Sequence, residues 1–160
     1  MSMGKVYVMD VDDTIILHTK EINDIYNMNN DTELKKMIES LNYSGFYLYT
    51  NGTYGHGYGV AANLQLNDIL NNIYARDTIP YMKPFLKSFN YVNDQITDYK
   101  RNDYNIIFFD DLIDNLMTAK RLGWTTVWIS GDFLEKPGGV DYAFPNIYEA
   151  LIYFKLEEGQ

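Results

Sequence analysis

The segment "KVYVMDVDDTIIL", residues 5–17, places an apolar run directly before three carboxylates. Its first half is short, β-branched and aromatic, a pattern typical of a buried strand over residues 5–10. Asp10, Asp12 and Asp13 follow at the end of that strand. Like charges repel there unless water solvates them in a turn or a cation balances them. The segment therefore predicts a buried strand that ends in either a solvated turn or a cation site.

Strand-like and helix-like segments alternate along the rest of the chain. Further strands are predicted at 45–50, 72–77, 105–110 and 125–130, and helices at 30–41, within 58–72, and at 83–96, 112–123 and 146–156. Continuous apolar strands separated by amphipathic helices indicate a mostly parallel central sheet covered on both faces. We expect an α/β fold, a Rossmann-like three-layer sandwich, with residues 1–160 forming a single domain.

Composition narrows the classes of function. The chain of 160 residues is 46% hydrophobic and 22% charged, which indicates a globular protein. Its net charge of −9 argues against nucleic acid as a partner, because an acidic surface repels phosphate backbones. The absence of cysteine excludes disulfides and thiolate metal sites. No membrane-spanning run and no signal-peptide core are present, so we expect a cytoplasmic protein with no membrane partner.

Polar side chains stand at the ends of three predicted strands. Asp10, Thr50 and Asp110 each close an apolar run, and open parallel sheets bind ligands at the carboxyl ends of their strands. We therefore expect Asp10, Asp12, Asp110 and Asp111 to share one crevice. Four carboxylates require a counter-ion there, and Mg²⁺ with oxygen ligands fits. The alternative is that these acids only start turns or cap helices.

Four motifs, in order, resemble those of the haloacid dehalogenase (HAD) superfamily of aspartate-nucleophile phosphohydrolases. They are "DVDDT" (10–14), "YTNGT" (49–53), "MKPF" (82–85) and "FFDDLIDN" (108–115). The resemblance covers nearly the whole chain and is greatest to the nucleotidase-like branch, the pyrimidine 5′-nucleotidases and their relatives. It implies a HAD-like core and a phosphatase activity that uses Mg²⁺.

The resemblance also implies a role for each matching residue. Asp10 is the expected nucleophile, which forms an aspartyl-phosphate, and Asp12 the general acid and base. Lys83 is expected to neutralise the nucleophile and the transferred group. Thr50 and Asn51 are the expected contacts of the phosphoryl oxygens.

The same resemblance implies a metal site. Asp110 and Asp111 are expected to hold Mg²⁺ together with Asp10 and the backbone carbonyl of Asp12. Asp111 is the preferred direct ligand, and Asp110 is direct or acts through water. Dehalogenation is disfavoured, because that chemistry does not use a second aspartate at the Asp12 position.

Three further residues are candidate substrate contacts. His18 and His56 lie in segments 17–29 and 51–59, which could form a partial lid, and Asn115 follows the paired acids. A lone loop histidine is more often plain surface.

Relatives usually carry a cap domain, but the gaps between motifs are too short for a domain of about 50 residues. We therefore expect no separate cap and an open cleft, which a second copy in a homodimer could cover. A nucleotide or similar small phosphorylated metabolite is the expected substrate. The alternatives are a phosphatase of phosphoprotein or polynucleotide ends, and a non-catalytic protein that binds phosphate or Mg²⁺.

Overall fold

The computed structural model of the protein describes residues 4–17, 32–98, 104–131 and 135–159. The strands are β1 (Gly4–Met9), β2 (Gly45–Tyr49), β3 (Asn72–Tyr74), β4 (Tyr104–Asp110), β5 (Thr125–Ile129) and β6 (Tyr142–Phe144). The helices are α2 (Glu33–Ser40), α3 (Tyr54–Asn63), α4 (Leu86–Thr97), α5 (Ile113–Arg121) and α6 (Ile147–Glu158).

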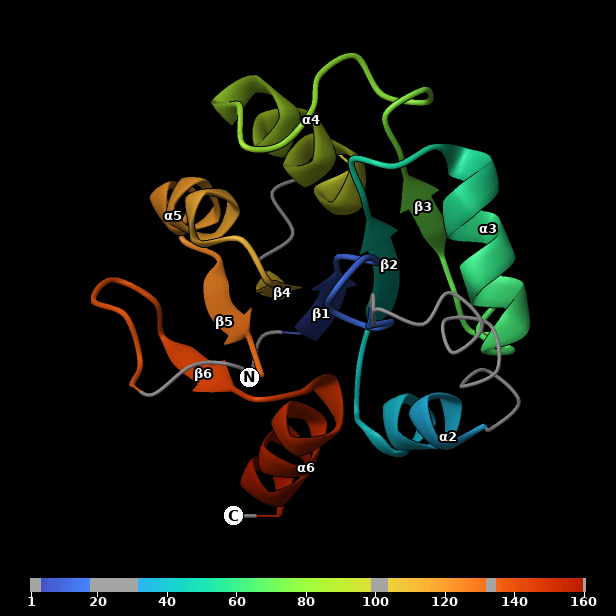
Figure 1. Ribbon diagram of the computed structural model, residues 1–160, viewed down its shortest axis with the longest axis vertical. Helices are drawn as coiled ribbons and strands as arrows, with labels where there is room; N and C mark the ends of the chain where they lie inside the picture. Colours follow the sequence, from blue (N-terminus) through green and yellow to red (C-terminus); the bar gives the residue numbers. More distant parts are fainter. Residues whose placement is uncertain (1–3, 18–31, 99–103, 132–134, 160) are drawn as a thin grey trace.

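Within the described residues these strands form a six-stranded sheet in the order β3-β2-β1-β4-β5-β6, with every neighbouring pair parallel. The predicted α/β fold with a mostly parallel sheet is confirmed. β1 lies in the middle of the sheet, between β2 and β4 (Figure 1). Asp10, Thr50 and Asp110, which stand at the carboxyl ends of β1, β2 and β4, are therefore neighbours in space.

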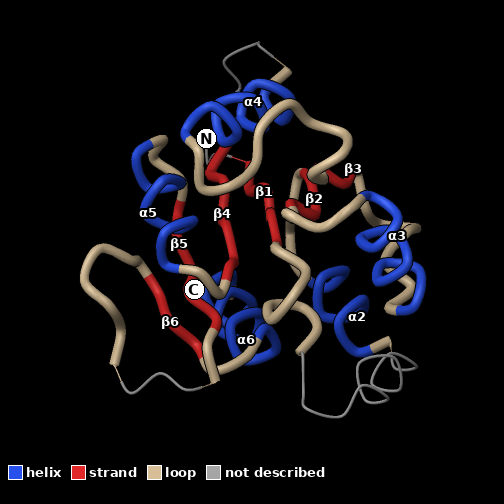
Figure 2. Tube along the Cα trace, turned by 45° about the horizontal axis from the view of Figure 1, so that its top comes forward, coloured by secondary structure: helices blue, strands red, loops and turns tan. Residues whose placement is uncertain are grey.

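Helices cover both faces of the sheet (Figures 1 and 2). Side chains of β1 alternate between two core clusters, with Val6 and Val8 packed toward α4 and α5, and Tyr7 and Met9 packed toward α2, α3 and α6. Successive side chains of a strand point to opposite faces, so a strand buried on both faces needs an unbroken apolar run. This requirement explains why residues 6–9, which follow Lys5, are all apolar.

Some boundaries differ from the prediction. α3 begins at Tyr54, because the Thr53 side chain caps it by accepting a hydrogen bond from the His56 N–H at 3.2 Å. The glycine-rich residues 54–59, expected as a loop, are therefore helical. α4 begins at Leu86, three residues after the predicted start at residue 83, so Pro84 precedes the helix. The predicted helix start at 30–31 lies outside the described residues.

β6 was not predicted. It is only three residues long and pairs with β5 at the edge of the sheet. The residue before β6, Asp141, attaches the chain to β5 and α5. Its carboxylate accepts hydrogen bonds from the Thr126 N–H at 2.8 Å, from the Thr126 hydroxyl at 3.0 Å and from Lys120 Nζ at 2.6 Å. No helix in the described part of the chain is long and apolar enough to cross a membrane.

Candidate active site

The carboxyl ends of β1, β2 and β4 bring the predicted residues together. Met9 is in register with Phe109, and the Asp10 N–H donates to the Phe109 carbonyl at 2.9 Å. Asp10 and Asp110 therefore leave adjacent strands at the same level. Because side chains alternate along a strand, Asp10 and Asp110 lie on the same face of the sheet as Val8 and Phe108, which is the face covered by α4 and α5. Lys83 approaches the two carboxylates from this face.

Lys83 is the cation at the centre of this cluster. Its Nζ donates to Asp10 Oδ1 at 3.0 Å, to Asp110 Oδ2 at 2.8 Å and to the Tyr49 carbonyl at 2.8 Å. The residue is only 3% exposed. Burial by itself lowers the pKa of Lys83, but the carboxylates of Asp10 and Asp110 reverse this effect and raise the pKa above its ordinary value. The lysine is therefore cationic at neutral pH.

Aromatic rings form the floor beneath this ammonium. Lys83 Nζ lies 5.0 Å from the centroid of the Tyr49 ring and 5.5 Å from that of Phe108. Phe89 and Trp124 pack edge-on against Phe108, with ring centroids 5.7 Å from it in both cases. A cation over an aromatic face is attracted by the ring quadrupole, most strongly where water is excluded. The rings thus hold the ammonium in a dry position beside the two carboxylates.

Asp10, Asp110 and Asp111 each offer an oxygen within 4.8 Å of the others. Burial raises the pKa of Asp10 well above its usual range; Lys83 opposes this rise and Asp110 adds to it. Burial, with Asp110, also raises the pKa of Asp111. One ammonium does not balance three carboxylates, so a divalent cation with a preference for oxygen ligands fits this donor set.

Asp110 and Asp111 differ in how they are held. Asp110 is fully buried and accepts hydrogen bonds from the Leu112 N–H at 2.9 Å and from Asn115 Nδ2 at 3.1 Å, besides the one from Lys83. Asp111 is only half-buried, and Trp128 Nε1 donates to its backbone carbonyl at 2.8 Å. This difference favours Asp111 as the direct metal ligand and Asp110 as the support behind it.

Asn51 has a position that the sequence did not indicate. Its Nδ2 donates to the Lys83 carbonyl at 2.9 Å, and its Oδ1 accepts from the Lys83 N–H at 3.0 Å. Both ends of the amide therefore hold the backbone of the lysine. Thr50 is buried, and its Oγ1 accepts a hydrogen bond from the Gly52 N–H at 2.9 Å. The expected phosphoryl contacts of Thr50 and Asn51 stay predictions, and Asn51 has a positioning role as well.

Asp12 and His56 meet at the rim of the site. Asp12 Oδ1 and His56 Nε2 lie 2.8 Å apart, and about a third of each side chain is exposed. A Cβ atom at Gly52 would lie 3.2 Å from Thr50 Oγ1, 3.2 Å from His56 Cδ2 and 3.7 Å from Asp12 Oδ2. The absence of a side chain at Gly52 thus lets these three residues approach one point.

The remaining candidates fall in different places. Asn115 is 3% exposed and donates to Asp110, so it supports that carboxylate, and its expected contact with substrate stays a prediction. His18 and most of the expected lid at 17–29 lie outside the described residues. Two supporting residues were missed: Thr14, whose hydroxyl donates to Asp10 Oδ2 at 3.2 Å, and Trp128. Thr14 is part of the first motif, whereas no sequence signal marks Trp128.

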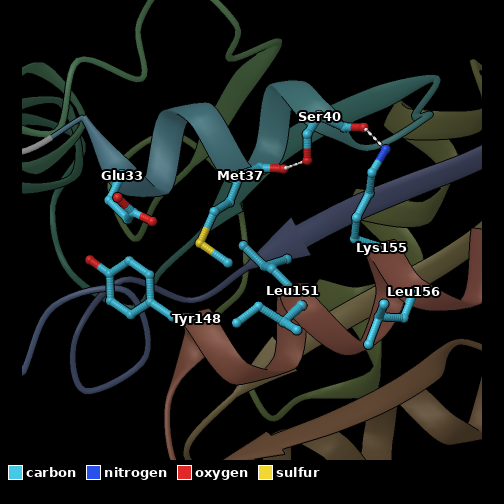
Figure 3. Close-up of a pocket in the computed structure, with 8 residues that line it drawn as sticks. Glu33, Met37, Ser40, Tyr148, Leu151, Lys155 and Leu156 are labelled. Carbon is cyan, nitrogen blue, oxygen red and sulfur yellow. Dashed lines mark hydrogen bonds between the residues drawn. The ribbon is translucent and has the colours of Figure 1, made fainter.

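An apolar groove of about 570 Å³ lies elsewhere, between α2 and α6 (Figure 3). Met37 from α2 faces Leu151 and Tyr148 from α6, and Lys155 closes one end by donating to the Ser40 carbonyl at 2.6 Å. The groove shares no lining residue with the carboxylate cluster. Its lining is mainly apolar, with Glu33 and Lys155 as the charged residues.

Comparison with solved structures shows that the chain shares a known fold. The HAD-hydrolase YfnB from Bacillus subtilis, bound to magnesium, matches 96% of this chain and 99% of its own, with 14% identity and a TM-score of 0.67. The chain has the HAD fold. A haloacid dehalogenase-like hydrolase from Streptococcus pneumoniae matches with 14% identity and a TM-score of 0.63, over 94% of this chain and 98% of its own.

A third structure, from Thermotoga maritima and named as a beta-phosphoglucomutase, has 11% identity and a TM-score of 0.64, covering 98% of this chain and 100% of its own. An L-2-haloacid dehalogenase is also among the matching HAD-fold structures. No protein-family model matches the sequence, and no curated protein is similar to it in sequence. At these identities the likeness concerns the fold, and the chemistry has to be inferred from the site.

Proposed function

We propose that this protein is a HAD-type phosphatase, a Mg²⁺-dependent phosphomonoesterase that forms an aspartyl-phosphate on Asp10. The observation that carries the proposal is the contact of Lys83 Nζ with both Asp10 and Asp110 inside a cluster of three carboxylates. A phosphoryl group in transfer carries negative charge spread over its oxygens, so fixed cations beside a nucleophile are the main requirement of this reaction.

Asp10 begins the reaction by attacking phosphorus with a carboxylate oxygen. A bond forms between Asp10 and phosphorus while the bond to the leaving oxygen breaks, and Asp12 gives its proton to that oxygen. Water then attacks phosphorus, Asp12 takes back a proton, and inorganic phosphate leaves as the Asp10 carboxylate is restored. Lys83 offsets charge at Asp10, and Thr50 holds phosphoryl oxygens.

The metal belongs to this proposal through its ligands. Asp10, Asp111 and the backbone carbonyl of Asp12 would hold Mg²⁺, with Asp110 supporting them from its buried position. When bound, the ion would neutralise the carboxylates and stabilise negative charge on the phosphoryl oxygens. The magnesium-bound HAD-hydrolase among the structural matches supports the choice of metal.

The substrate proposed is a nucleotide or a similar phosphorylated metabolite. The resemblance of the motifs to the nucleotidase-like branch supports this class. Residues 51–82 are all described and form only α3 and β3 as regular elements, which supports a cleft without a cap domain at that position. The net charge of −9 disfavours polynucleotide ends.

Hydrolysis of p-nitrophenyl phosphate tests the proposal. The wild type should release p-nitrophenol with Mg²⁺ and lose this activity in EDTA, and Asp10→Asn should be inactive while folded by circular dichroism. Equal rates for wild type and Asp10→Asn would refute the proposed mechanism. A panel of nucleotides, other phosphometabolites and phosphopeptides then separates the substrate classes, and release of halide from 2-chloropropionate tests the dehalogenase reaction.

A further inference from the structure

The contact between Asp12 and His56 concerns the acid–base step and rests on the proposed function. The two residues are 44 positions apart in sequence, and their 2.8 Å contact joins the turn after β1 to the first turn of α3. The Thr53 cap fixes the start of α3 by accepting from the His56 N–H itself. The backbone at residue 56 is therefore held at the helix terminus, and its ring is presented to Asp12.

The two oxygens of Asp12 have different surroundings. Oδ1 is in contact with His56 Nε2, whereas Oδ2 lies on the side of Gly52, whose missing Cβ would also contact Thr50 Oγ1. Thr50 is the residue expected to hold the phosphoryl group. The ring thus contacts one carboxyl oxygen, while the other lies on the side of Gly52 and Thr50, where the phosphoryl group is expected.

A carboxyl group at a partly exposed rim can occupy more than one rotamer, and only some rotamers suit proton transfer. Restricting that rotation from a helix raises the fraction of time spent in the productive geometry. We propose that His56 is a positioning residue that acts through Asp12, and that it aligns Asp12 to protonate a poor leaving group such as an alkoxide of a nucleoside 5′-monophosphate.

Substrates with different leaving groups distinguish a role in proton transfer from a general structural role of His56. p-Nitrophenolate leaves without needing a proton, whereas an alcohol has to be protonated as its bond to phosphorus breaks. The first-turnover rate with excess enzyme should be measured for a nucleoside 5′-monophosphate and for p-nitrophenyl phosphate. The variants are His56→Ala, His56→Gln, Asp12→Asn and the double variant His56→Ala with Asp12→Asn, with Tyr58→Ala on the exposed side of α3 as the matched control.

His56→Ala should lower the nucleotide rate roughly 10- to 100-fold, a part of the ~10²–10⁴-fold that general acid–base catalysis supplies. It should change KM little and leave the p-nitrophenyl phosphate rate within about twofold of wild type. His56→Gln, whose amide nitrogen reaches the place of Nε2, should restore most of the nucleotide rate. In the Asp12→Asn background His56→Ala should have no further effect, because the pair then acts as one unit.

Equal losses on both substrates, or a further loss in the Asp12→Asn background, would overturn the inference. So would an unchanged nucleotide rate in His56→Ala, or a Gln variant no better than Ala. If wild type and Asp10→Asn are equally inactive, the proposed function fails instead, and the contact is then judged by ¹⁵N NMR of the imidazole. With the other histidine removed by His18→Gln, Asp12→Asn should shift the His56 ring signals and Tyr58→Ala should not; unshifted signals would refute the contact itself.

Discussion

Replacing Lys83 by methionine should destabilise the protein strongly. Methionine keeps much of the side-chain volume and removes the ammonium that joins Asp10 and Asp110. Lys83 is 3% exposed and Asp110 fully buried, so water does not replace the lost contacts. Removing one partner from a buried ion pair costs about 3–5 kcal/mol, because the remaining charge is buried and uncompensated. We expect a loss of this size in the free energy of unfolding without Mg²⁺.

Urea denaturation in EDTA measures this loss. Lys87→Met is the matched control, because it makes the same chemical change four positions away at an exposed lysine, whose Nζ lies 5.5 Å from the Tyr81 ring. Exposed substitutions usually change stability by less than about 0.5 kcal/mol. Adding Mg²⁺ should restore about 2.7 kcal/mol to Lys83→Met at a concentration 100 times its Kd, because the ion binds only the folded state.

A loss below about 1 kcal/mol in Lys83→Met, similar to that of the control, would refute the reasoning, since surface ion pairs are worth this little. It would mean that the buried ammonium is not needed to hold the carboxylates together. A strong loss of stability that Mg²⁺ does not relieve would agree with the ion-pair argument, but it would contradict the proposal that Mg²⁺ binds at this cluster.

Three further outcomes are expected. Asp111→Asn should weaken Mg²⁺ binding at least about tenfold by isothermal titration calorimetry, as loss of a charged ligand requires, whereas Asp114→Asn, at an exposed acid three positions later, should not. Asn51→Ala should lower stability in urea by roughly 1–3 kcal/mol, because two hydrogen bonds of about 0.5–1.5 kcal/mol each are lost; a change near zero would contradict its positioning role. Burial tends to raise the pKa of Asp141, but Lys120 and the neighbouring Thr126 donors lower it overall. The ionised Asp141 therefore stabilises the folded state above its unfolded pKa of 3.8, and this stabilisation is lost as the pH falls through the lower folded pKa. The stability difference between Asp141→Asn and wild type in chemical denaturation should therefore be constant near neutral pH and shrink below about pH 4, and a difference that grows there would contradict the assignment.

The central strands were predictable because burial on both faces requires an unbroken apolar run. β1 and β4 meet this condition, and their ends at Asp10 and Asp110 were therefore correctly placed. β6 has only three residues, all partly exposed, and gives no such signal. The start of α3 was wrong because the cap at Thr53, together with the burial of Gly57, Val60 and Ala61, offsets glycines that each cost about 1 kcal/mol in a helix.

The residues that gather around Lys83 were predictable from motif order, but the contacts that support them were not. The pairing of Asn51 with Lys83 joins residues 32 positions apart, and that of His56 with Asp12 joins residues 44 apart. Such contacts depend on where the loop that carries Lys83 and the first turn of α3 lie relative to the sheet. No pattern within either segment alone encodes that placement. Asn115 shows the same limit, since its motif position did not reveal that it lies behind Asp110.

The pairing of β1 with β4 runs without offset from Gly4 opposite Tyr104 to Met9 opposite Phe109. One residue inserted into either strand would displace its terminal acid by about 3.3 Å and turn it to the opposite side of the sheet. Length variation in descendants or engineered versions of this chain is therefore confined to connecting segments. Loop grafts can alter what the protein binds, whereas the span from Gly4 to Asp10 has to keep its residue count.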